Sequence, residues 1–200
     1  MNAPSQFALP QEMTQGMQTA WNQSFPIGES REQGGLLVRN RDGSLKWLPG
    51  QAGSSSQFSP NYDDANPHQS LVAVGHTHPY SYREHNLTNV PFSGDDLAQH
   101  VFEQQRLSIV QSGQGLFGSA RTLEFDALVK ARGQAGEEAL ADEIREFWKG
   151  AFFSQPGDSR ERAEVATRVT SERYHLLYYA GKQGILNRVV PELAAKHRDK

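Results

Sequence analysis

The segment LVAVGHTHP, residues 71–79, limits the possible folds more than any other part of the chain. It opens with an uninterrupted apolar run and ends at a proline, which cannot donate a hydrogen bond to a neighbouring strand. A short apolar run bounded in this way is typical of a buried β-strand. We therefore expect a sheet that contains this strand, with His76 and His78 at its carboxyl end.

A β-hairpin is predicted before this strand. Residues 34–38 and 45–48 have strand-like patterns, and the Asp42-Gly43 pair between them is a strong turn signal. Residues 49–70 are dense in glycine, proline, serine and asparagine, which predicts a long irregular surface loop.

Strands and helices alternate in the remainder of the chain. Strands are predicted at residues 107–110 and 116–120, on either side of a glycine-containing turn. Apolar residues at helical spacing predict helices at residues 11–21, from Ser93 onward, at residues 137–153 and at residues 161–180. The predicted elements indicate a mixed α/β (α+β) fold class, in which helices cover a sheet.

Composition excludes several classes of function. The length of 200 residues suits one domain. The formal net charge is -3, so the chain lacks the positive excess that binding to nucleic acid requires. No stretch approaches the roughly 20 apolar residues of a membrane span, and no secretory signal peptide is visible at the start. We expect a protein that is cytoplasmic in its producer, with export only through a specialised secretion system.

The two histidines are the first chemical signal. The chain has no cysteine, so a bound metal must use histidine, aspartate or glutamate. His76 and His78 are two residues apart on a strand and therefore point to the same face, where both imidazoles can reach one ion. Taken alone, such a pair more often consists of ordinary polar or core histidines than of metal ligands.

Two further motifs supply carboxylates. Ser93-x-x-Asp96 is a capping box that accounts for a helix start, and its aspartate can also be a metal ligand if it faces the histidines. Glu32 stands at the head of the hairpin strand, where a glutamate is usually just solvated. Beside a zinc site it can instead take a proton from water.

The order Glu32, His76-x-His78-Pro79, Ser93-x-x-Asp96 resembles the JAB/MPN metallopeptidases, also called the JAMM family. The surrounding REQGGLLVRNRDGSLKWLP and VGHTHPY...FSGDD are most similar to bacterial JAB-like domains associated with RHS elements and polymorphic toxins. The resemblance covers about residues 29–120. It implies the cytidine-deaminase-like mixed sheet of that family, which is central, mostly antiparallel and flanked by helices. The domain organisation would be an N-terminal arm at residues 1–28, a JAB/MPN-like catalytic core at 29–124 and a mostly helical extension at 125–200 packed on the same domain.

The resemblance also implies a role for each motif residue. His76, His78 and Asp96 would bind Zn²⁺, with water in the fourth position. Glu32 would be the general acid/base, and Ser93 would help to hold the oxyanion that forms during attack on an amide carbonyl. Three protein ligands and an open position are also what catalytic zinc sites require chemically.

One departure from the family pattern affects this assignment. Fourteen residues, 79–92, separate His78 from Ser93, whereas the family commonly has a shorter connection. Asp95 is therefore an alternative to Asp96, and Glu29 is a weaker alternative to Glu32.

The long connection can itself be functional, because both of its ends are attached to predicted metal-binding elements. As a lid it would supply an aromatic wall, a charge for a substrate carboxylate and a further zinc ligand. As an ordinary loop it would merely tolerate extra length. The candidate substrate-binding residues in it are Tyr80, Tyr82, Arg83 and His85.

These observations predict a zinc-dependent hydrolase of amide or isopeptide bonds, acting on a protein or peptide. The resemblance to toxin-associated domains further implies a bacterial toxin or effector with a cognate inhibitor or immunity protein. Two alternatives are a non-catalytic binding or structural module of the same fold, and a toxin that hydrolyses a target other than protein.

Overall fold

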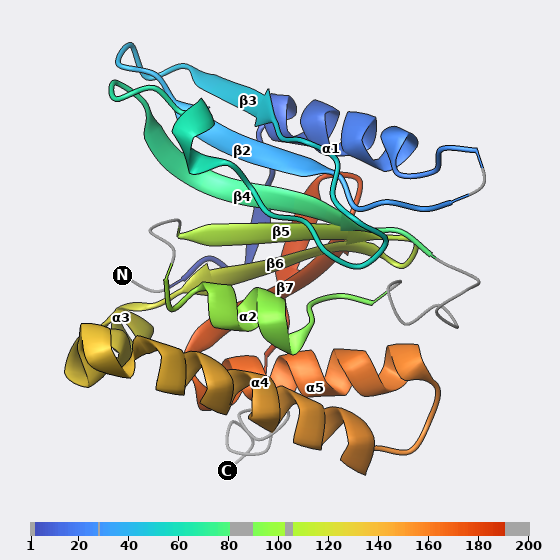
Figure 1. The fold of residues 1–200 in the computed structure, drawn as a ribbon, viewed down its shortest axis with the longest axis vertical. Coiled ribbons are helices and arrows are strands. Elements are labelled where there is room, and N and C mark those ends of the chain that lie inside the picture. The colour runs from blue at the N-terminus through green and yellow to red at the C-terminus, as the bar shows by residue number, and fades with distance from the viewer. Residues whose placement is uncertain (1–2, 28, 81–89, 103–105, 191–200) are drawn as a thin grey trace.

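The structure is a computed structural model that describes residues 3–27, 29–80, 90–102 and 106–190. The described strands form one sheet in the order β1-β8-β7-β6-β5-β4-β2-β3 (Figure 1). The strands are β1 (Gln6–Ala8), β2 (Gly34–Arg39), β3 (Leu45–Pro49), β4 (Ser70–His78), β5 (Leu107–Ser112), β6 (Gly115–Arg121), β7 (Leu176–Lys182) and β8 (Ile185–Arg188). The α-helices are α1 (Gln11–Gln23), α2 (Gly94–Gln99), α3 (Leu123–Arg132), α4 (Glu137–Ser154) and α5 (Ser159–Arg173), with short 3-10 turns at η1 (Tyr62–Asp64) and η3 (Gln134–Gly136).

Strand β4 lies inside the sheet, as its apolar sequence predicts. It pairs antiparallel with β2 and parallel with β5, while the other neighbouring strands that the structure describes pair antiparallel. The predicted hairpin is present as β2 and β3, with Gly43 at a φ of 86° in its turn, a backbone conformation that favours glycine. The mixed α/β class and the mostly antiparallel sheet are thus confirmed.

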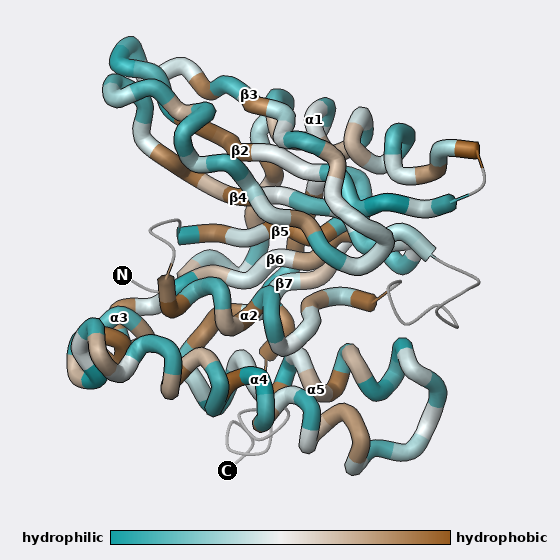
Figure 2. Tube along the Cα trace, viewed as in Figure 1, coloured by the Kyte–Doolittle hydropathy of each residue, from teal (hydrophilic) through white to brown (hydrophobic). Residues whose placement is uncertain are grey.

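The two faces of the sheet are covered differently. Helix α1 packs on one face, where Met13, Met17 and Leu37 belong to one buried cluster. On the other face, α2, α3 and α4 cover β5, β6 and β7 through a second cluster, and α5 lies beside α4 (Figure 1). The loop that joins β3 to β4 crosses this same face over β2 and β4 (Figure 1). Figure 2 shows hydrophobic residues along the strands and hydrophilic residues at the hairpin tips.

The helix predicted at residues 161–180 is wrong beyond Arg173. Helix α5 ends there, His175 has a φ of 58°, and β7 begins at Leu176. Tyr178 belongs to the cluster beneath the helices and Tyr179 to the cluster beneath α1, so β7 is buried on both faces. A strand of this kind has a continuous apolar run, and periodicity cannot distinguish it from a buried helix.

The other predicted helices are present. Residues 11–21 form α1, residues 137–153 form α4, and α2 follows Ser93 but ends at Gln99. None of the described helices has both the length and the apolar character needed to cross a bilayer. The predicted arm and the predicted extension contribute β1, β7 and β8 to the same sheet as β4. The boundaries at residues 28 and 124 stay a prediction.

Candidate metal centre

The two histidines of β4 converge on the face of the sheet that carries α2. His76 and His78 are separated by one residue of extended backbone, so both side chains project to this face. Their Nε2 atoms are 3.0 Å apart, and both side chains are nearly buried. Thr77 points to the opposite face, where its hydroxyl bonds to Ser24 Oγ at 2.7 Å. The expected juxtaposition of the imidazoles is therefore present.

Helix α2 brings Asp96 to the histidines. The Asp96 carboxylate lies 3.1 Å from His76 Nε2 through Oδ1 and 3.4 Å from His78 Nε2 through Oδ2. A capping box fixes this carboxylate, because the Ser93 backbone N–H and hydroxyl both donate to Asp96 Oδ2, at 2.6 and 2.7 Å. The cap thus starts the helix and orients the aspartate.

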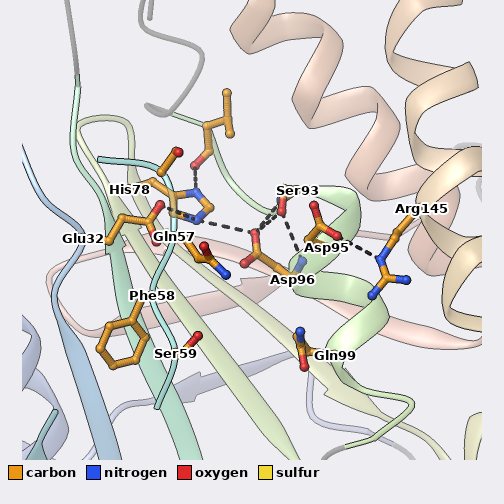
Figure 3. Close-up of a pocket in the computed structure, with 12 residues that line it drawn as sticks. Glu32, Gln57, Phe58, Ser59, His78, Ser93, Asp95, Asp96, Gln99 and Arg145 are labelled. Carbon is orange, nitrogen blue, oxygen red and sulfur yellow. Dashed lines mark hydrogen bonds and ion pairs between the residues drawn. The ribbon is translucent and has the colours of Figure 1, made fainter. Parts of the chain in front are cut away.

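Glu32 approaches from the segment that precedes β2. Its Oε1 lies 3.8 Å from His78 Nε2, and the residue is only 4% exposed. Its backbone is held by the long loop, since Glu32 N–H donates to Ser54 O at 2.7 Å and Gly53 N–H donates to Glu32 O at 2.8 Å. Figure 3 shows Glu32 and Asp96 on opposite sides of His78.

Hydrogen bonding and burial set the charge state of the centre. The carbonyl of Val90 lies 3.1 Å from His78 Nδ1, which places the proton of a neutral imidazole on Nδ1. The lone pair of Nε2 is then available to coordinate a cation. Burial lowers the pKa of His78 to about 4, so this imidazole is neutral at pH 7. Burial opposes ionisation of Asp96, but both imidazoles and Ser93 hold the pKa of its carboxyl below the usual value.

These residues are suited to holding a divalent cation. One ligand atom each from Glu32, His76 and His78 lies within 4.8 Å of the other two, and Asp96 is within 3.4 Å of both imidazoles. The buried Glu32 carboxylate and the partly buried Asp96 carboxylate, beside a neutral imidazole, need a compensating positive charge. Nitrogen and oxygen ligands of this kind suit zinc. Two ligand sets are possible, both containing His76 and His78, with either Asp96 or Glu32 as the carboxylate ligand.

The alternative carboxylates lie away from the histidines. Asp95 forms an ion pair with Arg145 of α4 at 2.9 Å, and its side chain is 78% exposed. Glu29 pairs with Arg31 in a similarly exposed position. The geometry therefore favours Asp96 over Asp95, and Glu32 over Glu29.

The predicted substrate-binding residues are only partly described. Tyr80 lies with its ring 4.7 Å from Phe25 and 6.3 Å from Trp21, measured between centroids, and it does not line the cavity at the centre. Tyr82, Arg83 and His85 lie outside the described residues. Their role in substrate binding stays a prediction.

A cavity of about 750 Å³ opens at the centre, and we call it the main cavity. Besides the predicted residues, it is lined by Ser56, Gln57, Phe58, Ser59, Val90, Gln99 and Arg145 (Figure 3). No motif in the sequence indicates these residues, although a phenylalanine in an otherwise polar loop was a usable signal for Phe58. The Phe58 ring stacks on His76 at a centroid distance of 6.0 Å and an interplanar angle of 12°. Gln99 follows Asp96 by three residues and so lies on the same side of α2.

No protein-family model, curated protein or solved structure matches the chain. The resemblance of residues 29–120 to the JAB/MPN metallopeptidases therefore stays a prediction. The function has to be inferred from the residues that meet at the metal centre.

Proposed function

We propose that this protein is a zinc-dependent hydrolase of amide or isopeptide bonds, of the JAB/MPN type. The observation that carries the proposal is the convergence of three separate segments on one buried point. Glu32 precedes β2, the histidines end β4, and Asp96 begins α2, yet their polar atoms lie within 3.0 to 3.8 Å of His78 Nε2. Chance proximity is a poor explanation for one buried and one partly buried carboxylate around two imidazoles, because burying uncompensated charge is costly.

Each residue has a separate task in this proposal. His76, His78 and Asp96 hold the ion, and a zinc ion at such a site lowers the pKa of water and polarises a carbonyl. Glu32 takes a proton from the attacking water and transfers it to the leaving amine, which its position beside His78 supports. The set that uses Glu32 as a ligand is the competing assignment.

Ser93 supports the proposal in a different way from that expected. Its hydroxyl donates to Asp96 and accepts from the Asp96 backbone N–H at 3.1 Å, so it orients a metal ligand. The predicted contact with an oxyanion requires the hydroxyl to turn away from Asp96. That role stays a prediction.

Metal content is the first experiment. Protein purified without added zinc is expected to contain about one zinc per chain by elemental analysis. The double variant His76→Ala, His78→Ala should lose this metal, whereas His68→Ala, an exposed histidine in the long loop, should retain it. Absence of metal in the wild type, or unchanged zinc in the double variant, would contradict the proposal.

Glu32→Gln separates the general base from a ligand. The amide keeps the shape of the side chain but cannot accept the proton, so cleavage of a peptide and isopeptide mixture, followed by mass spectrometry, should slow by about 10² to 10⁴ while zinc stays bound. Glu29→Gln is the matched control, because Glu29 lies in the same segment and is exposed. Loss of zinc in Glu32→Gln would make Glu32 a ligand instead.

The substrate, the inhibitor and the toxin role follow only from the family resemblance. If zinc binds, and neither a peptide nor an isopeptide mixture is cleaved, a binding module or a hydrolase of another target becomes the better explanation. Capture of a partner by zinc-loaded Glu32→Gln, which retains the site, would then identify the target.

A further inference from the structure

The centre opens on a second cavity as well as the main one. This second cavity has a volume of about 250 Å³ and lies on the His76 side of the site. The two cavities share Phe58, Ser59, Asp96 and Gln99 in their linings, so they adjoin each other beside the metal-binding residues. A chain bound with its reacting amide at the centre can therefore extend into both.

Apolar and aromatic side chains line part of the second cavity. Phe58, Pro60 and Tyr62 come from the long loop and Val74 from β4, and the polar remainder of the lining is Ser59, His76, Asp96, Gln99 and Ser108. Among the described residues no lysine or arginine lines it, and its single carboxylate, Asp96, is already bonded to Ser93 and close to both histidines. An anionic side chain would therefore find no lysine or arginine to pair with there.

One buried serine lines this cavity beside the apolar residues. Ser108 of β5 stands beside Val74 in the sheet register, and the residue is only 7% exposed. An occupant of the cavity covers this hydroxyl and takes it out of contact with water. Leaving such a group unpaired costs about 1–3 kcal/mol, so an occupant that supplies a partner is favoured over one that does not.

We propose that the second cavity is a specificity subsite for an aromatic side chain next to the reacting amide, and that it takes tyrosine in preference to phenylalanine. This inference rests on the proposed hydrolase function. A dry cavity of about 150 Å³ accepts benzene, so 250 Å³ holds a phenol ring. The ring packs against Phe58 and Tyr62, and its hydroxyl pairs with Ser108 Oγ.

Zinc-chelating hydroxamates test the subsite without knowledge of the substrate. We compare acetohydroxamate, 2-phenylacetohydroxamate and 2-(4-hydroxyphenyl)acetohydroxamate on the zinc-loaded full chain by calorimetry. The phenyl compound should bind at least about tenfold more tightly than the acetyl compound, because a ring is buried. The hydroxyphenyl compound should bind about threefold more tightly again, because it pairs with Ser108.

Three variants assign the effect to the cavity. Ser108→Ala should abolish the preference for the hydroxyphenyl compound and retain the preference for a ring. Tyr62→Ala, a change in a partly exposed loop residue, should reduce the preference for a ring by about threefold or more. Gln57→Ala is the matched control, since Gln57 lines the main cavity and not the second one. It should change neither the phenyl-to-acetyl nor the hydroxyphenyl-to-phenyl ratio of affinities.

The outcomes separate the subsite from the proposed function. Three results would overturn the subsite while leaving the zinc site intact. They are equal affinity for the three hydroxamates, an effect of Gln57→Ala as large as that of Tyr62→Ala or Ser108→Ala, and binding of the cationic 5-aminopentanohydroxamate that is tighter than binding of the aromatic compounds. If the protein binds no zinc, the hydrolase proposal fails, and binding of p-cresol followed by NMR decides the subsite. Binding of p-cresol that both Ser108→Ala and Tyr62→Ala weaken would support the aromatic subsite, and absence of p-cresol binding would refute it.

Discussion

One face of the sheet is covered in two different ways. Over β5 to β7, helices bury a continuous cluster that includes Phe125, Leu140 and Ile144, none of which is exposed. Over β2 and β4, an irregular loop covers a smaller cluster of Leu36, Val38 and Val74. Most apolar burial on this face therefore lies under the helices, and we expect the helical side to supply more of the folding free energy.

The two carboxylates of the centre are held by these different covers. Asp96 belongs to α2, and the segment just before α2 is tied to the helices by Thr167, whose hydroxyl donates to Phe92 O at 2.8 Å. Glu32 is attached to the loop through backbone hydrogen bonds with Gly53 and Ser54. The proposed metal ligand Asp96 and the proposed base Glu32 are therefore positioned by different parts of the fold. Mutations should be able to affect zinc binding without affecting proton transfer, and the reverse.

Leu140→Ala should have the largest effect on the free energy of unfolding. Leu140 is fully buried under the helices, and removing a leucine from such a position costs about 2–5 kcal/mol. Chemical denaturation measures the loss, and the zinc content of the folded fraction should not change. A cost below about 1 kcal/mol would contradict the assignment of most folding free energy to the helical side.

Gly34→Ala should disturb the loop side. An added Cβ would collide with the Gly75 carbonyl oxygen and come within 2.8 Å of the Phe58 ring, so the strand pairing or the loop must shift. Overpacking of this kind costs about 1–3 kcal/mol, and it should also reduce hydrolysis because Glu32 lies two residues away. Gly150→Ala in α4 is the control, since nothing lies within 4 Å and the helix should gain up to about 1 kcal/mol. Equal effects of Gly34→Ala and Gly150→Ala on the rate of hydrolysis would contradict the conclusion that the loop side, and not the helical side, positions Glu32.

His100 should make the helical side sensitive to acid. Burial, together with the charge of Arg121, lowers the pKa of His100 to about 3, whereas an unfolded histidine titrates near about 6.5. Between these values the unfolded chain binds one proton more, so the free energy of unfolding falls as pH decreases, by up to about 1.4 kcal/mol per pH unit. The variant His100→Gln should lack the part of this decrease in the free energy of unfolding that comes from His100, whether or not zinc is bound. A constant difference between wild type and variant from pH 7 to pH 4 would contradict the expectation.

Ser93→Ala should have the smallest effect on folding but a measurable effect on zinc. Loss of an N-cap costs about 1 kcal/mol, and loss of the hydrogen bond to a metal ligand typically weakens metal affinity by about 10- to 100-fold. Competition with a zinc chelator measures the affinity. Asp95→Asn changes an exposed neighbour and should leave stability within about 0.5 kcal/mol and zinc affinity unchanged. Equal zinc affinity in wild type and Ser93→Ala would show that the cap does not support the ligand.

Much of the fold was predictable because its signals are local. The Asp42-Gly43 turn, the Ser93 cap and the apolar run ending at Pro79 each depend on a few neighbouring residues, and the hairpin, α2 and β4 appear where these signals predict them. The same holds for the proximity of His76 and His78, since two residues along a strand always share a face.

Only the tertiary structure decided which of two similar neighbours enters the centre. Asp95 and Asp96 are adjacent acids in one helical turn, and the packing of α2 against α4 points the first at Arg145 and the second at the histidines. The strand β7 and the contact of Phe58 with His76 depend likewise on partners distant in sequence. Local patterns fix backbone shape through nearest neighbours, but which side chains share a buried site depends on long-range packing, which has no local sequence signature.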